Sequence, residues 1–260
     1  MFRRRAKTGK PTEAQLRDPA WVPIPRSWLP LELVRGEIGA RGWLLAYRRT
    51  INAVADARSV VATILPASGV GDSLFLMGGA SLKARDACVL IGMLNAFIFD
   101  YVARQKATGG NLSFYLLKQM PVLPPEALDD VARQFVVDRV LELTFTAWDL
   151  EPFAQECGNC AKPLAWNTAR REAIRAELDA MMLRLFGVSR EDAGYVLDFF
   201  EVVRRRDEKE FGEYRTKRLI LEIYDTMAEA SRTGKPYQTR LDPPPADPRV
   251  AHPDIRGSKP

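Results

Sequence analysis

The feature that most limits the fold is a change in the spacing of apolar residues near residue 82. Before it, apolar residues form three short runs closed by turn residues, at 43–48, 59–65 and 73–77. Runs of this kind are typical of β-strands. From 82 to 105, apolar residues recur at the spacing of one helical face, as in Leu90, Leu94 and Tyr101.

An apolar stripe also runs through most of the remaining chain. Helices are expected near 126–147, 168–186, 189–204 and 208–232. Gly187 and Ser189 carry the stop and start signals between the second and the third of them. The pattern predicts an α+β protein, in which a small mixed β unit with one long amphipathic helix precedes a helical C-terminal subdomain.

Proline and charge divide the chain further. Residues 1–40 are expected to be a basic, proline-rich arm or linker, and residues 233–260 a flexible, proline-rich tail. The α+β unit would then cover 41–125 and the helical subdomain 126–232. Of the net charge of +5, the first 60 residues contribute twelve Lys/Arg against five Asp/Glu. This asymmetry favours a polyanionic partner, although a solvated arm would look the same.

Targeting and membrane signals are lacking in the sequence. The arginines at 3–5 are not followed by an apolar stretch, so a signal peptide is not expected. No apolar run reaches the roughly 18 residues needed to span a bilayer. We therefore expect a cytoplasmic protein without a membrane partner.

The residues needed for common catalytic and metal centres are scarce. The one histidine, His252, lies in the proline-rich tail, where an oriented general base is not expected. Cys157 and Cys160 form a CxxC pair without the second pair that structural zinc usually needs, so two incidental loop thiols are favoured. No catalytic residue and no metal site are predicted.

Two short motifs resemble cofactor or substrate sites and are rejected as such. The glycines of 68–72 could suggest a nucleotide-binding turn, but a strand-like run follows them, so a hairpin loop is the better interpretation. Residues 242–245, Asp-Pro-Pro-Pro, resemble the Asp/Asn-Pro-Pro-aromatic motif that amino-methyltransferases use on a flipped base. They lack the aromatic ring and a preceding strand.

Three groups of segments, in this order, resemble one protein family. The first is WLLAYRRT (43–50) with DARS (56–59) and ATILP (62–66). The second is LNAF (94–97), DYVARQK (100–106), GNL (110–112) and MPVLPP (120–125). The third is RAELDA (175–180), LFGVS (185–189), YVLDFF (195–200) and EFGEYRTK (210–217). Together they resemble the C-terminal target-recognition region of restriction-associated adenine-specific DNA methyltransferases, of the type IIG and phage-defence kinds.

The resemblance implies that the chain reads a DNA sequence for a restriction-modification or phage-defence system. The family's glycine-rich S-adenosylmethionine motif and its Asn-Pro-Pro-aromatic motif do not occur here. We therefore expect no cofactor on this chain. Methyl transfer would belong to a separate catalytic subunit or upstream domain that carries S-adenosylmethionine, and this chain would be a split subunit or a fragment of the enzyme. A type I-like specificity subunit and a protein-interaction module that does not bind DNA remain as alternatives.

Double-stranded DNA is the expected partner, gripped through its phosphates and read at base edges. Residues at the ends of strands and helices, where side chains can reach outward, are the candidates. The expected phosphate contacts are Arg48, Arg49, Arg58, Arg104 and Lys106. Gln105 and Asn111 carry amides that can pair with an adenine edge.

Overall fold

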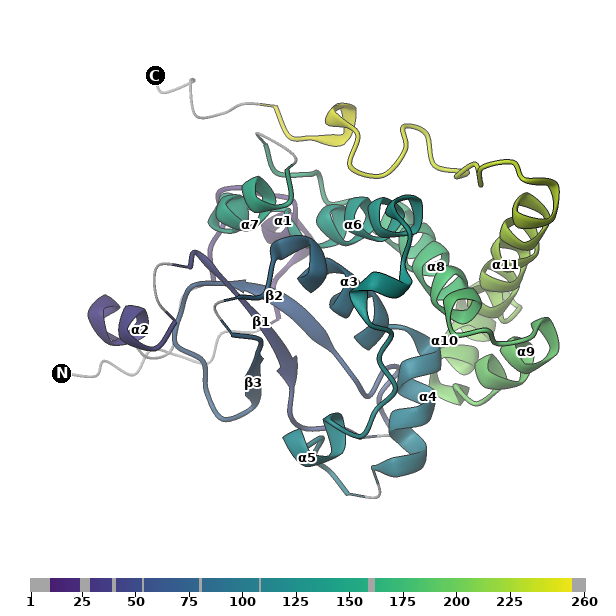
Figure 1. Ribbon diagram of the computed structural model, residues 1–260, viewed down its shortest axis with the longest axis horizontal. Coiled ribbons are helices and arrows are strands. Elements are labelled where there is room, and N and C mark those ends of the chain that lie inside the picture. The colour runs from purple at the N-terminus through teal and green to yellow at the C-terminus, as the bar shows by residue number, and fades with distance from the viewer. Residues whose placement is uncertain are drawn as a thin grey trace.

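A three-stranded antiparallel sheet stands at one side of a mainly helical protein (Figure 1). The computed structural model describes residues 10–23, 29–38, 41–52, 54–79, 81–107, 109–158 and 162–253. The strands are β1 (Trp43–Arg48), β2 (Ala62–Pro66) and β3 (Leu74–Met77), in the spatial order β2-β1-β3. The predicted α+β class and the three strands are confirmed.

The path between β2 and β3 differs from the prediction of a hairpin. Leu45 of β1 is paired with Ile64 on one side and with Met77 on the other, and both pairings are antiparallel. The outer strands therefore run parallel to each other on either side of β1. The chain between them, with its two glycines, has to cross from one end of the sheet to the other, which a two-strand hairpin loop does not do.

The helices account for most of the chain. Ahead of the sheet lie two short ones, α1 (Glu13–Leu16) and α2 (Leu31–Ile38). After the sheet come α3 (Ala84–Leu94), α4 (Phe97–Lys106), α5 (Phe114–Leu117), α6 (Asp130–Thr144), α7 (Glu151–Glu156), α8 (Thr168–Leu185), α9 (Arg190–Asp198), α10 (Glu201–Phe211) and α11 (Arg215–Thr233). Short 3-10 turns occur at Pro125–Ala127, Trp148–Leu150 and Pro248–Val250.

The long helix predicted over 82–105 is two helices, α3 and α4, which bend by 64° at the break between them. At the break, the side-chain amide of Asn95 forms two hydrogen bonds with the backbone of Ala62 in β2, as a neighbouring strand would. Its Oδ1 accepts from the Ala62 N–H at 3.0 Å, and its Nδ2 donates to the Ala62 carbonyl at 2.9 Å. The Phe97 N–H, at the start of α4, donates to Asp179 at 2.8 Å. The apolar spacing continues across the bend, and so it gave no sign of the break.

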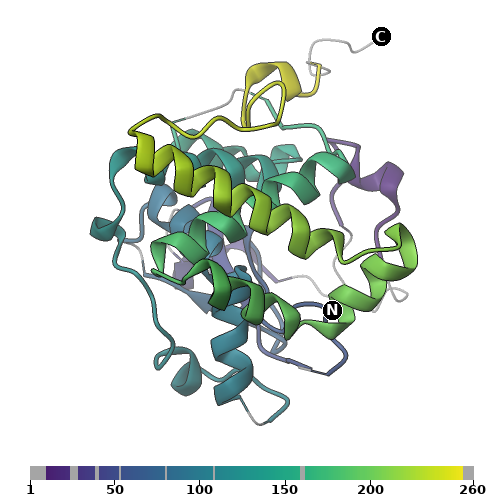
Figure 2. The ribbon, with the colours of Figure 1, turned by 90° about the vertical axis from the view of Figure 1, so that its right-hand side faces the viewer.

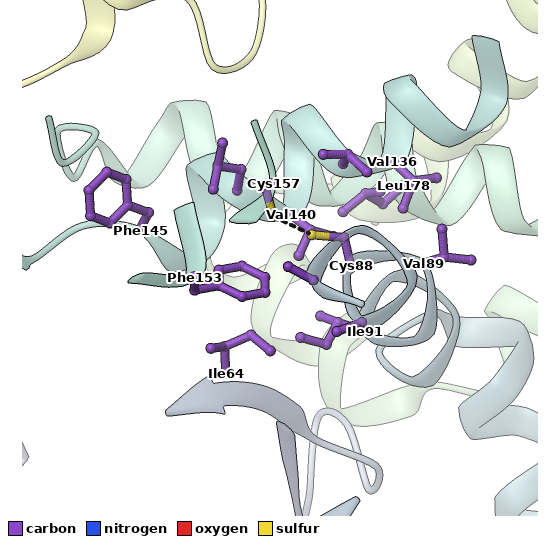
Figure 3. Packing of buried hydrophobic residues seen from close by; sticks show 14 of the residues in the cluster. Ile64, Cys88, Val89, Ile91, Val136, Val140, Phe145, Phe153, Cys157 and Leu178 are labelled. Carbon is purple, nitrogen blue, oxygen red and sulfur yellow. Dashed lines mark hydrogen bonds between the residues drawn. The ribbon is translucent and has the colours of Figure 1, made fainter. Parts of the chain in front are cut away.

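The core lies between the sheet and helices α3, α6 and α8 (Figure 3). Ile64 of β2, Ile91 of α3 and Val140 of α6 are all buried in it. The sulfur atoms of Cys88 and Cys157 lie 3.7 Å apart there, so Cys157 is a core residue and not the loop thiol expected from sequence. Burial raises the pKa of the Cys88 thiol, with a further contribution from its hydrogen bond to Cys157.

Helix α11 packs on α8, and α9 and α10 pack on α11, around a second apolar cluster. Gly187 takes a left-handed conformation with φ of 67°, and the Ser189 hydroxyl accepts from the Asp192 N–H at 3.0 Å, which confirms the predicted stop and start signals. The next boundary is not where it was expected. Gly212, at φ of 75°, ends α10, so the segments predicted at 189–204 and 208–232 form three helices.

Residues 234–253, here called the C-terminal strap, run back over the helices from the end of α11 (Figure 2). The hydroxyl groups of Tyr237 and Thr239 donate to the buried Glu177 carboxylate at 2.7 and 2.6 Å. The Ala246 N–H donates to the buried Glu142 at 2.8 Å. The expectation of a loose tail does not hold for these residues, because the strap supplies hydrogen bonds that two buried carboxylates need.

Residues 10–23 are also attached to the body of the protein. The Pro19 carbonyl, in a buried residue, accepts from the Trp148 N–H at 3.0 Å. Across the described residues, no single helix is long and apolar enough to cross a membrane. The bent pair α3 and α4 has the length and composition only when taken together.

Replacing Asn95 by Ala should destabilise the protein by about 1–3 kcal/mol, because it leaves the Ala62 N–H and carbonyl without partners. The loss is measured as the free energy of unfolding in urea. Asn111→Ala is the matched control, since Asn111 is exposed and its amide makes no hydrogen bond to any described residue. Its effect should stay within about 0.5 kcal/mol. Equal losses in the two variants would contradict the role given to Asn95.

Candidate nucleic-acid interface

Three of the predicted phosphate-binding arginines face carboxylates inside the protein. The Arg104 side chain is only 4% exposed, and its guanidinium donates to the Asp56 carbonyl at 2.9 Å and lies 3.4 Å from Asp100. The Asp100 carboxylate in turn accepts from the Ser59 N–H at 2.8 Å. The prediction that Arg104 contacts DNA is therefore wrong, because its charge is already used to hold the chain before β2 against α4.

Arg58 connects the segment before β2 to helix α8. Its guanidinium lies 2.6 Å from Asp179 of α8, donates to the Asn95 carbonyl, and stacks 3.6 Å from the centre of the Phe97 ring. With a side chain 21% exposed, Arg58 has a structural role, and its contact with DNA stays a prediction. Asp179 is 121 positions away from Arg58 in the sequence, so no local sequence pattern could predict this pair.

Arg48 and Arg49 leave the end of β1 in different directions. Arg48 forms an ion pair with Asp56 and donates to the carbonyl groups of Arg58 and Ser59 at 3.2 and 3.1 Å, so it also serves the interior. Its side chain is 33% exposed, so its role as a phosphate contact stays a prediction. Arg49 pairs with the exposed Asp72 and lies 5.7 Å from the centre of the Phe75 ring. Its side chain remains partly open to solvent.

The other three predicted residues are exposed near one end of the molecule, where α4 stops. Gln105 and Lys106 end α4, and Asn111 lies in the return to the sheet. A bridge between Thr50 and Asn111 fixes that return, with the Leu112 N–H donating to the Arg49 carbonyl at 2.7 Å. The structure thus brings Asn111 next to Arg49 and Thr50 at the end of β1, as is needed if Arg49 and Asn111 belong to one site.

Helix α5 completes this end of the molecule, at the bottom of Figure 1. The Phe114 ring stacks on Phe75 with ring centres 4.6 Å apart, which anchors the helix under β3. Tyr115 is 76% exposed, and Lys118 and Gln119 are exposed beside it in sequence. We call the following set the α4–α5 surface: Gln105, Lys106, Asn111, Tyr115, Lys118 and Gln119.

Charge distinguishes this surface from the rest of the chain. No Asp or Glu occurs between Asp100 and Glu126, a stretch that includes Arg104, Lys106 and Lys118. Elsewhere, most cations near the surface face carboxylates, as in the pairs of α10 and α11. The sequence therefore contained a signal for Lys118, Tyr115 and Gln119, namely a long acid-free stretch with amides and an aromatic residue, which the search for strand and helix ends did not use.

Metal binding has no support in the described part of the chain. Within those residues, no group of three or more His, Cys, Asp or Glu side chains could hold a metal ion. His252 lies in the C-terminal strap, and burial lowers the pKa of its imidazole.

Comparison with known proteins adds no relative. No protein-family model, no curated protein and no solved structure matches this chain. The functional argument therefore rests on the residues and on their arrangement.

Asp179→Ala should destabilise the protein by roughly 3 kcal/mol, because it leaves Arg58 and the Phe97 N–H without their buried partner. The measurement is chemical unfolding followed by circular dichroism. Asp225→Ala is the matched control, since it breaks an ion pair with Arg190 in which both side chains are about half exposed. That variant should lose less than about 1 kcal/mol. A similar loss in both would show that the Arg58–Asp179 pair has no special structural role.

Proposed function

We propose that this chain binds double-stranded DNA through the α4–α5 surface. We further propose that it is the sequence-recognition part of an adenine-specific DNA methyltransferase of a restriction-modification or phage-defence system. S-adenosylmethionine and the methyl-transfer chemistry would belong to a separate catalytic subunit or domain. The single observation that carries the DNA-binding proposal is the exposed group of lysines, amides and a tyrosine in a stretch without acidic residues.

The residue types of this surface suit the two parts of DNA recognition. Lys106 and Lys118 can neutralise phosphates, which supplies most of the sequence-independent affinity. Gln105, Asn111 and Gln119 can each donate and accept at an adenine edge in the major groove. The family assignment is supported by the ordered resemblance of the segments and by nothing else.

One observation favours the alternative of a protein-interaction module. Tyr195 of α9 and Phe199, which directly follows α9, are 67% and 45% exposed, and both lie edge-on to the Tyr101 ring. Exposed aromatic residues are enriched at protein interfaces. A catalytic subunit could dock on this face, so the two functions are compatible, and DNA binding is the property that separates them.

Binding of a labelled duplex, followed by fluorescence anisotropy over a salt series, tests the proposal. The wild-type affinity should fall steeply with salt, since displaced counterions are released from the phosphates. Changing both Lys106 and Lys118 to Ala should weaken binding to all sequences and reduce the salt slope by about two.

The control variant changes Lys209 and Lys235 to Ala. Both lysines are exposed, on α10 and just after α11, and lie outside the α4–α5 surface. This variant should bind as the wild type does. If the wild-type chain, alone or with its methylase partner, shows no duplex binding at roughly 50 mM salt, the proposal fails.

A further inference from the structure

A second site lies away from the α4–α5 surface, in an open cavity of about 580 Å³. Strand β2, the corner between α3 and α4, and helices α6, α8, α10 and α11 contribute to its wall. The volume falls within the range of small-molecule sites, which is about 300–1,000 Å³. Nothing in the DNA-binding proposal uses this cavity.

The lining of the cavity contains six arginines and four carboxylates. Each carboxylate is taken by one arginine. The four pairs are Arg48–Asp56, Arg58–Asp179, Arg206–Asp207 and Arg215–Glu172. Two arginines, Arg171 and Arg175, remain without a carboxylate partner among the described residues, which leaves the cavity with an excess of two positive charges.

These two arginines lie four residues apart on α8 and so share one face of that helix. Part of the Arg171 guanidinium already contacts the protein: it donates to the Leu143 carbonyl at 2.9 Å and stacks 3.6 Å from the centre of the Trp166 ring. Arg175 makes no hydrogen bond or ion pair with any described residue. It is nevertheless an exposed residue that lines the cavity.

The electrostatic setting of both guanidinium groups favours an anion. Burial, followed by the charge of Arg175, lowers the pKa of Arg171 to about 9. Burial, followed by the charge of Arg58, likewise lowers the pKa of Arg175. Arg175 is therefore both exposed to solvent and surrounded in large part by protein, as is expected of a residue that lines a cavity. An anion in the cavity would relieve the repulsion among these cations.

Apolar side chains also line the cavity. They include Ile91, Phe97, Val140, Leu143, Phe211 and Leu219. Side chains of this kind do not hold a small hydrated ion by themselves, but they suit the ring or hydrocarbon part of a larger ligand. The cavity therefore combines cationic groups with a surface for an apolar body.

We propose that this cavity binds a small organic phosphate, with the phosphate at Arg175 and the apolar or aromatic body against the apolar side chains of the lining. A phosphomonoester suits the site better than a carboxylate, because it carries close to two negative charges at neutral pH and the cavity has two positive charges in excess. The planar fork of a guanidinium also matches two phosphate oxygens at once. This site is independent of the DNA-binding surface.

Isothermal titration calorimetry with phenyl phosphate, adenosine 5′-monophosphate and inorganic phosphate tests the proposal. The pH should lie about two units above the second phosphate pKa of about 6, so that each probe is a dianion. At least one of the two organic phosphates should bind at least ten times more tightly than inorganic phosphate. If neither does, the proposal is overturned.

Arg175→Met removes the charge and keeps most of the side-chain volume. It should raise the dissociation constant of the organic phosphate at least tenfold. Arg205→Met is the matched control, because Arg205 is an exposed arginine of α10 that does not line the cavity. Unchanged binding in Arg175→Met would also overturn the proposal.

Folding is not expected to confound this comparison, because Arg175 has no partner to lose. If Arg175→Met nevertheless unfolds, Arg206→Met replaces it, since Arg206 lines the cavity with an exposed side chain. That variant should also weaken binding of the organic phosphate, and unchanged binding would count against the site.

The two proposals of this article separate in the same set of variants. Arg175→Met should retain duplex binding. The variant with Lys106 and Lys118 changed to Ala should retain organic-phosphate binding. Loss of organic-phosphate binding in the lysine variant would place that ligand on the α4–α5 surface and so refute the cavity site.

Discussion

The arrangement of the whole chain depends on one buried carboxylate, that of Asp179. It accepts the N–H of Phe97, where α4 begins, and the guanidinium of Arg58, from the segment before β2. Three parts of the chain that are distant in sequence therefore meet at one side chain of α8. A buried carboxylate is stable only when it is paired and hydrogen-bonded, so the geometry of these partners is tightly constrained. The bend at Asn95 and the joint between the β unit and the helices are consequences.

Buried carboxylates paired with arginines also occur where the C-terminal strap meets the helices. Glu177 is paired with the buried Arg139 at 2.7 Å and also accepts the hydroxyl groups of Tyr237 and Thr239. Glu142 is paired with Arg170 and accepts the Ala246 N–H. Each carboxylate has one arginine that balances its charge and one or more strap groups that complete its hydrogen bonds. A proline-rich segment with little apolar surface is thus held by polar contacts in the interior.

These joints explain why the predicted site residues divided as they did. Arg48, Arg58 and Arg104 were chosen because they stand at chain ends, and each faces inward because a carboxylate lies within reach. Gln105, Lys106 and Asn111 stayed at the surface, in a stretch that has no carboxylate to draw them in. A position at the end of a strand or helix therefore identified exposed side chains only where no carboxylate lay nearby. The excess charge of Arg171 and Arg175 is likewise visible only after the other four arginines of the cavity have been matched with their partners.

The sequence by itself determined the class of the fold, its three strands, most of its helices and the signals at Gly187 and Ser189, because apolar period and cap residues act over a few neighbours. The absence of a glycine-rich S-adenosylmethionine motif and of an Asn-Pro-Pro-aromatic motif from the sequence could also be seen without a structure. Only the tertiary structure decided the bend at Asn95, the crossover from β2 to β3, the packing of the strap and the inward direction of three arginines. Each of these depends on hydrogen bonds or ion pairs between residues far apart in the chain, as between Arg58 and Asp179, and local patterns carry no record of such partners.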